Sequence, residues 1–302
     1  MPKLPLTNYF LKQPHSTLNV ASLGIFLLVA SAAWGLNVVG QMAFPSLNWV
    51  PFLVRSALTV ILDVLVLVLS VFLLKQNRIP TEALGLPLSK TNLLNLLSGI
   101  LIATASLAMI QALLYTRAPF HFDRGTLQLT DLLKESCSYL VGNSMEELMF
   151  RGFLLLVISR SAGWQIAILL TSLAFGLFHL QGTGINIVGL RMVASTGTYG
   201  LVFALSYVVT RSLWTAISVH ATSNILLHAI LGLDGANQSI FVTVFTGNGQ
   251  INGDWGLEAL VLGAIATSCF LYLLVVYKFK KQTEGRWAIT TGTRPVYVRF
   301  DD

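Results

Sequence analysis

Residues 51–74 read PFLVRSALTVILDVLVLVLSVFLL, a stretch in which Arg55 and Asp63 are the only charged side chains. An unbroken apolar run of about 20 residues is the length that a helix needs to cross a bilayer. The whole chain has 302 residues, of which 54% are hydrophobic and only 11% are charged. A water-soluble fold of this size cannot bury so much apolar surface. The sequence therefore predicts an all-α, polytopic membrane protein.

Apolar runs of this kind recur along the chain. They predict about eight transmembrane helices, at residues 21–43, 51–74, 93–115, 133–159, 164–180, 190–210, 213–231 and 257–277. The chain then divides into an N-terminal arm (1–20), the first three helices (21–130), a core of four helices (131–231), a loop with the last helix (232–277) and a basic tail (278–302). A signal peptide cleaved near Ala30 is the alternative for the first run. The run continues past Trp34 to Phe44, which favours a helix.

The basic residues predict the orientation of the chain, because cytoplasmic loops of membrane proteins collect Lys and Arg. The chain holds 19 Lys and Arg against 13 Asp and Glu, and the basic excess falls in the arm, in the loop after the second helix, at Arg160 and Arg211, and in the tail. Residues 44–50, 116–131 and 232–256 have no such excess. Both termini are therefore predicted in the cytoplasm, with 232–256 as a flexible outer loop in which Ser239 is accessible. Since the positive charge records orientation, it gives no reason to infer a nucleic acid partner.

Ionisable side chains inside apolar spans are costly, so each is a functional hypothesis. Those that we single out are Asp63, Glu146, Glu147, Arg151, His179, His220 and His228. The two cysteines, Cys137 and Cys269, show no CxxC or metal-ligand spacing. We interpret them as packing residues.

Residues 143–151, with the sequence NSMEELMFR, concentrate charge in one predicted helix. Glu147 and Arg151 lie one turn apart, within roughly 40° of each other around the helix, so they can form a salt bridge that supports the site. Glu146 points about 100° away from Glu147 and has no local cation. Polar residues that merely link helices are the alternative. Two adjacent acids and an arginine in one span favour a functional role.

Two later spans each carry a histidine and a second motif residue at i, i+4 spacing. Phe175 and His179 share one helix face, and His220 and Asn224 share another. Either pair alone would be typical of side chains that link helices. Together with Glu146 they supply a base, two imidazoles and an amide donor. This set suits attack of water on an amide, with His220 and Asn224 donating hydrogen bonds to the oxyanion.

The same side chains allow other functions. Glu146, His179 and His220 would also form a zinc ligand set with an open fourth position, and spacing alone does not separate the two chemistries. A transporter or channel that uses these residues as a proton or ion relay is the main alternative from another class, although the sequence shows no inverted repeat. A scaffold or immunity partner without turnover is a third. The sequence contains no HExxH motif, no aspartate pair in a GxGD setting and no GxSxG motif.

Three ordered motifs in residues 131–231 resemble the signature of the CPBP family (CAAX protease and bacteriocin-processing, or Abi), which includes the type II CAAX prenyl proteases. The motifs are Glu146-Glu147-x-x-x-Arg151, Phe175-x-x-x-His179 and His220-x-x-x-Asn224. The flanking residues 150–154 (FRGFL) and 212–214 (SLW) agree with this resemblance. Phe175 has a supporting role beside the charged residues.

The resemblance implies an intramembrane endopeptidase with an eight-helix fold. In it, Glu146 and His179 activate a water molecule, and His220 and Asn224 form the oxyanion site, without a metal. The implied partner is a membrane-associated peptide or protein within the lipid bilayer, prenylated in eukaryotic members and otherwise undefined. The short loops and the absence of organelle signals favour a bacterial plasma membrane. Nothing in the sequence indicates an oligomeric state.

Overall fold

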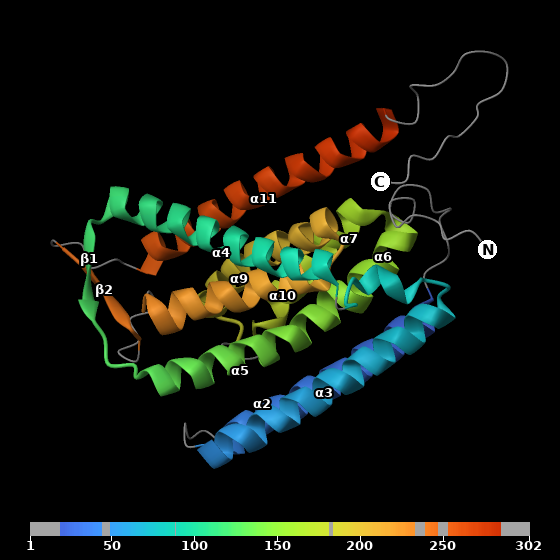
Figure 1. Cartoon of the computed structure of the whole chain (residues 1–302), viewed down its shortest axis with the longest axis horizontal. Coiled ribbons are helices and arrows are strands. Elements are labelled where there is room, and N and C mark those ends of the chain that lie inside the picture. Colours follow the sequence, from blue (N-terminus) through green and yellow to red (C-terminus); the bar gives the residue numbers. More distant parts are fainter. Residues whose placement is uncertain are drawn as a thin grey trace.

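The computed structural model describes residues 19–43, 49–87, 89–180, 184–232, 239–246 and 253–284. Most of the predicted N-terminal arm and of the basic tail lies outside these residues. Within them the chain is a bundle of long helices with one two-stranded sheet at one end (Figure 1).

The helical segments occupy the eight regions that the apolar runs predict. The α-helices are α2 Val20–Ala43, α3 Trp49–Gln76, α4 Lys90–Arg117, α5 Leu129–Glu147, α6 Leu155–Ala162, α7 Trp164–Phe178, α9 Ile187–Thr210, α10 Leu213–Asn224 and α11 Gly253–Glu284. A short 3₁₀ helix, η1 (Thr81–Leu84), precedes α4, and two π-helical segments are η2 (Leu148–Leu154) and η3 (Ile225–Ile230). Because η2 joins α5 to α6, these three elements together occupy the predicted helical region 133–159. In the same way, α10 and its extension η3 occupy the predicted region 213–231.

Only some of these helices are long and apolar enough to cross a membrane. Five in the described part of the chain meet this criterion, at Val20–Gly40, Phe52–Gln76, Lys90–Thr116, Ile187–Thr210 and Leu257–Lys278. The predicted number of eight spans is therefore not confirmed. The apolar helix α7 is too short, and the segments α5–η2–α6 and α10–η3 carry the motif side chains. Much of these segments is buried inside the bundle, where neighbouring helices rather than lipid surround polar groups.

A small sheet departs from the all-α prediction. Strands β1 (Phe120–Arg124) and β2 (Phe241–Phe245) pair antiparallel, with Phe120 opposite Phe245 and Arg124 opposite Phe241. Cross-strand aromatic contacts, such as the 5.6 Å between the ring centroids of Phe120 and Phe245, stabilise the pair. The prediction of a flexible loop over 232–256 is wrong for β2, because its alternating aromatic and β-branched residues favour a strand.

The two ends of the bundle differ in charge, as the loop pattern predicts. The sheet joins the segments after α4 and η3 at one end. At the other end, Arg160 donates hydrogen bonds to the carbonyl oxygens of Asn77 and Arg78, and Lys278 donates to Val209 at 3.1 Å. The basic turns are thus gathered at one end. Which end faces the cytoplasm stays a prediction.

Two expectations about single residues are wrong. Ser239 is buried, and its hydroxyl donates a hydrogen bond of 2.6 Å to the carbonyl oxygen of Phe241, because it lies where the chain enters β2. The thiols of Cys137 and Cys269 are free and exposed, since both lie on outward faces of α5 and α11. They are therefore not packing residues of the core.

Candidate active site

The motif residues lie where two helices change their winding. Glu146 and Glu147 end α5, and the chain continues directly into the π-helical segment η2, all of whose residues are buried. Asn224 ends α10, and the chain continues into η3. Short π-helical stretches inside α-helices are rare and frequently occur at functional sites, because the wider turn redirects side chains. Two of the three motif helices therefore show the same local signal.

Glu147 and Arg151 form the predicted salt bridge. The Nη1 atom of Arg151 lies 3.0 Å from Oε1 of Glu147, and both side chains are fully buried. Nη2 of Arg151 donates a 3.0 Å hydrogen bond to the carbonyl oxygen of Gly200 in α9. The guanidinium carbon lies 4.5 Å from the ring centroid of Phe175 and 5.3 Å from that of Phe203. Arg151 therefore holds α5–η2, α7 and α9 together around one buried charge.

His220 contacts both glutamates. Its Nδ1 lies 2.9 Å from Oε1 of Glu147, and its Nε2 lies 3.9 Å from Oε2 of Glu146. A carboxylate oxygen accepts hydrogen bonds, so Nδ1 carries a proton and Nε2 is directed toward Glu146. Sequence reasoning assigned Glu147 to Arg151 alone. The structure shows that the same carboxylate also orients His220.

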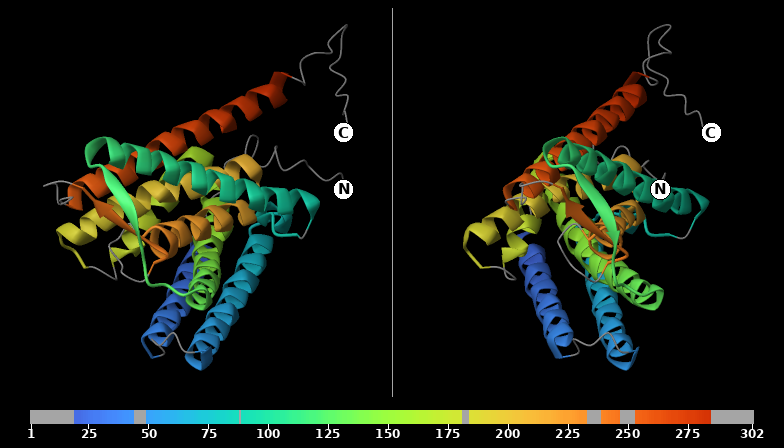
Figure 2. Two further views of the ribbon diagram at one scale, coloured as in Figure 1. Left: turned by 60° about the vertical axis from the view of Figure 1, so that its left-hand side comes forward. Right: turned by 90° about the vertical axis from the view of Figure 1, so that its left-hand side faces the viewer.

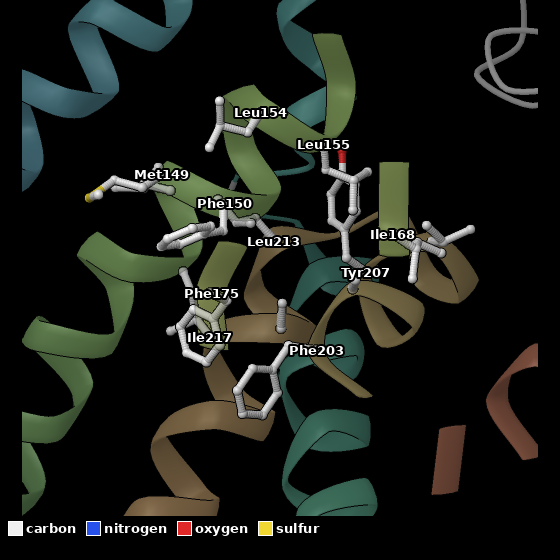
Figure 3. Packing of buried hydrophobic residues seen from close by; sticks show 14 of the residues in the cluster. Met149, Phe150, Leu154, Leu155, Ile168, Phe175, Phe203, Tyr207, Leu213 and Ile217 are labelled. Carbon is white, nitrogen blue, oxygen red and sulfur yellow. The ribbon is translucent and has the colours of Figure 1, made fainter. Parts of the chain in front are cut away.

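Aromatic rings enclose the His220 side chain. Phe203 stacks on its imidazole with ring centroids 4.3 Å apart, and Phe175 approaches it edge-on at 5.6 Å. Phe175 also contacts Phe150 of η2 at 5.2 Å, and Figure 3 shows these phenylalanines packed together. The rings leave the imidazole few orientations and surround the charged groups with apolar surface.

His179 follows the last residue of α7 and joins the same cluster. Its Nδ1 donates a 2.8 Å hydrogen bond to the carbonyl oxygen of Phe175, which can only accept. The imidazole lies 4.8 Å from the Phe175 ring, which therefore contacts both His179 and His220. His179 is also close enough to Glu146 for an electrostatic interaction.

Asn224 reaches α5 one turn before the glutamates. Its Nδ2 donates to Oδ1 of Asn143 at 3.3 Å. The structure thus brings Glu146, His179, His220 and Asn224 from three helical segments to one region. Sequence reasoning missed Asn143, although its i, i+3 spacing to Glu146 is a usable signal.

Gly200 and Phe203 were also missed, and nothing in the sequence of α9 marks them. A Cβ atom at Gly200 would lie 3.2 Å from Nη2 of Arg151 and 3.1 Å from Cα of Ser172. The absence of a side chain at Gly200 thus lets α9 approach both α7 and the buried arginine. Phe203 lies one turn further along α9 and provides the ring that stacks on His220.

Several polar atoms in this cluster are buried without a hydrogen-bond partner. They are Oε2 of Glu146, Oε2 of Glu147, Nδ2 of Asn143 and Nε of Arg151. Buried polar groups in proteins are nearly always satisfied, so a local group of exceptions requires an explanation. Both acceptors and donors are available here for a bound molecule.

The zinc alternative was tested against the positions of these side chains. Among the residues that the structure describes, no three His, Cys, Asp or Glu side chains are arranged to hold a metal ion. The Nδ1 atoms of His220 and His179 are engaged by Glu147 and by a carbonyl oxygen, which leaves Nε2 as the ring nitrogen of each that could bind a metal. As they stand in the described part of the chain, Glu146, His179 and His220 are not grouped as a zinc ligand set.

Comparison with known proteins addresses the family. No curated protein matches the chain significantly. A family model described as type II CAAX prenyl endopeptidase Rce1-like matches residues 132–226, the region that contains all three motifs. Residues 132–226 therefore form a domain of the Rce1-like type II CAAX prenyl endopeptidase family, in agreement with the resemblance of the motifs.

Proposed function

We propose that this integral membrane protein hydrolyses a peptide bond of a membrane-associated peptide or protein, with Glu146 as the base that activates water. The Rce1-like domain is that of a protease family, which supports hydrolysis in general. One observation carries the finer assignment. Oε2 of Glu146 is buried without a hydrogen-bond partner and lies 3.9 Å from Nε2 of His220, so a water molecule held by Glu146 would lie beside the proposed oxyanion donor.

The proposed first step is attack of water on the scissile carbonyl carbon. Glu146 removes a proton from water, and His179 helps to hold the same molecule. The aromatic rings of Phe175 and Phe203 keep bulk water away from the charged groups. In such an environment the electrostatic interactions of Glu146 are stronger than they would be in water.

The developing oxyanion accepts hydrogen bonds from His220 and Asn224. For His220 to donate from Nε2, both of its nitrogens must carry protons. Its two ring nitrogens face carboxylate oxygens of Glu147 and Glu146, which accept hydrogen bonds. Glu147 has the role of holding the imidazolium in place through Nδ1.

The second step breaks the carbon–nitrogen bond. The tetrahedral intermediate collapses, the oxyanion returns to a carbonyl, and Glu146 passes its proton to the departing amine nitrogen. One water molecule is consumed, and the products are a carboxylic acid and an amine. No metal or redox cofactor takes part in the proposed steps.

The proposed substrate is a peptide that is held at the membrane, because the reacting groups lie inside the helical bundle. A prenylated C-terminal peptide is the first substrate to test, since the matched family is described as type II CAAX prenyl endopeptidase. We propose a bacterial plasma membrane as the location, with both termini in the cytoplasm, on the basis of the short loops and the basic residues.

The test is a cleavage assay with the purified full chain in lipid nanodiscs. The probe is an internally quenched peptide that ends in a farnesylated cysteine and three further residues, with its unprenylated form alongside. Glu146→Gln and Glu146→Ala should lower kcat by about 100-fold or more, as loss of a general base does. The matched control is Glu258→Gln, the same change on the exposed face of α11, which should leave kcat unchanged. Full activity of Glu146→Ala would refute the proposal.

A further inference from the structure

The helices α2 and α3 hold two buried polar atoms that the proposed reaction does not use. They are Nε1 of Trp34 and Oδ1 of Asp63, and neither has a hydrogen-bond partner in the structure. Both lie within candidate membrane spans, Trp34 in Val20–Gly40 and Asp63 in Phe52–Gln76. A donor and an acceptor that are buried in spans without partners are costly, so their position relative to the active site is informative.

Asp63 lies at the level of Glu146. The helices α3 and α5–α6 run in the same direction (Figure 1 and Figure 2), and one hydrogen bond joins them near each end. At one end, Nη2 of Arg55 donates a 3.2 Å hydrogen bond to Oγ of Ser138, which is 83 residues later in the chain. At the other end, Arg160 donates to the carbonyl oxygen of Asn77, again 83 residues away. Because the offset between the two helices is the same at both ends, Asp63 lies opposite the residue 83 positions later, which is Glu146.

Trp34 lies at the level of Asp63. The helices α2 and α3 are antiparallel, and Oγ1 of Thr59 donates a 2.7 Å hydrogen bond to Oδ1 of Asn37. One turn back from Asn37 along α2 is Trp34, and one turn on from Thr59 along α3 is Asp63. The two unpartnered atoms therefore lie at one depth, and this is the depth of Glu146.

The Trp34 ring borders the active site. Its centroid lies 4.7 Å from that of Phe178, the last residue of α7. Phe178 in turn contacts Phe150 at 5.5 Å and the neighbouring His179 at 6.0 Å. Trp34 thus reaches the motif helices from α2, through a single aromatic side chain.

A peptide that enters a site among membrane helices must exchange the hydrogen bonds of its main chain with water for hydrogen bonds with protein. Each unsatisfied N–H or C=O group there costs several kcal/mol. An extended peptide presents both kinds of group beside every bond. One indole donor and one carboxyl acceptor at the depth of the catalytic glutamate match this need.

We infer that Trp34 and Asp63, which we call the hairpin pair, bind the main chain of the substrate peptide beside the scissile bond. Nε1 of Trp34 donates to a substrate carbonyl oxygen, and Oδ1 of Asp63 accepts from a substrate amide N–H. The inference rests on the proposed function, and it assigns α2 and α3, which lie outside the matched domain, a part in substrate binding. Both are positioning residues and take no part in proton transfer.

Binding is measured without turnover, in the full chain carrying Glu146→Gln. The probe is the farnesylated peptide described above, with its affinity followed by fluorescence anisotropy in nanodiscs. Trp34→Phe and Asp63→Leu should each weaken binding by about five- to tenfold, the effect of one lost hydrogen bond. Asp63→Asn keeps an oxygen acceptor and should bind within about twofold of the parent. Equal loss with Asp63→Asn and Asp63→Leu would mean that a substrate cation is recognised instead, which would overturn the inference.

Thermal stability separates this role from a structural one. Both Trp34→Phe and Asp63→Leu remove a buried polar group that has no partner, so the Tm of the free protein should stay the same or rise. The matched control is Trp214→Phe, because Nε1 of Trp214 donates a 2.9 Å hydrogen bond to the carbonyl oxygen of Leu86. That variant should lower the Tm and leave peptide affinity unchanged. A lowered Tm for either hairpin-pair variant would overturn the inference.

A series of peptides, each N-methylated at one amide, identifies the substrate amide N–H that binds Asp63. One position should lose affinity in the parent and lose nothing further in Asp63→Leu, which is the signature of a direct partner. Additive losses at every position would refute the contact.

If Glu146→Ala abolishes cleavage while the hairpin-pair variants bind normally, this inference fails and the proposed function stands. If Glu146→Ala cleaves normally while the hairpin-pair variants bind weakly, the proposed function fails instead.

Discussion

The imidazole of His220 is held by Glu147, whose Oε1 lies 2.9 Å from Nδ1, while Oε2 of Glu146 lies 3.9 Å from Nε2 on the other side of the ring. The two adjacent acids therefore differ in environment. Oε1 of Glu147 is within hydrogen-bond distance of both Arg151 and His220, whereas Oε2 of Glu146 has no hydrogen-bond partner and meets His220 only at 3.9 Å. This difference is the reason that we propose Glu146 as the base and Glu147 as the residue that orients His220.

Changes at Glu147 should affect both activity and stability. Glu147→Gln keeps an oxygen acceptor for His220 but removes the charge that faces Arg151, so we expect kcat to fall by about 100-fold and the Tm to fall as well. Glu147→Ala should be worse in both measurements, since it also frees the imidazole. Cleavage of the quenched peptide and thermal unfolding provide the two readouts. Wild-type kcat in Glu147→Ala would contradict the orienting role.

Loss of Arg151 should destabilise the protein strongly. Arg151→Ala leaves Glu147 buried beside a vacated position and breaks the hydrogen bond to Gly200, and breaking a buried pair typically costs about 3–5 kcal/mol. Purification yield and the Tm in nanodiscs measure the effect. Arg124→Ala, on an exposed strand position, is the control that should leave both unchanged. A stable Arg151→Ala variant would argue against the pairing.

The close approach of α7 and α9 should depend on Gly176. A Cβ atom there would lie 2.7 Å from the carbonyl oxygen of Val193, so Gly176→Ala should force the helices apart at a cost of about 1–3 kcal/mol. Gly142→Ala in α5 is the matched control, because nothing lies within 4 Å of its Cβ position. The control should stabilise the helix by up to about 1 kcal/mol. Equal Tm changes in the two variants would show that α7 and α9 are not in contact at this glycine.

The orientation of the chain can be tested at the sheet. In a variant without Cys137 and Cys269, Asp123→Cys on β1 should react with a membrane-impermeant maleimide added to intact cells, since its side chain is exposed and its end of the bundle is predicted outside. Ser239→Cys should react poorly from either side, because that position is buried. Labelling of Asp123→Cys only after permeabilisation would reverse the orientation.

Hydrolysis should need no stoichiometric metal. We expect kcat to survive dialysis against a chelator and elemental analysis of the active protein to give much less than one zinc per chain. The physical reason is that the described residues hold no three His, Cys, Asp or Glu side chains arranged to bind a metal ion. Activity that is lost on chelation and restored by zinc would decide for a metalloprotease.

The sequence alone determined the helical segments and the residue types of the site. Apolar runs of spanning length have few interpretations, so the eight helical regions were predictable. The pairing of Glu147 with Arg151 was predictable as well, because i, i+4 neighbours meet on any helix. The family followed from motif order in the chain, which needs no three-dimensional information.

The tertiary structure decided everything that depends on contacts between distant segments. The hydrogen bond from His220 to Glu147, the ring of Phe203 on His220 and the approach of Gly200 to Arg151 join residues on different helices. Periodicity within one helix carries no information about which residue of another helix faces it. The strand at 241–245 and the burial of Ser239 also depend on contacts between distant segments. A strand forms only when a partner segment supplies its hydrogen bonds.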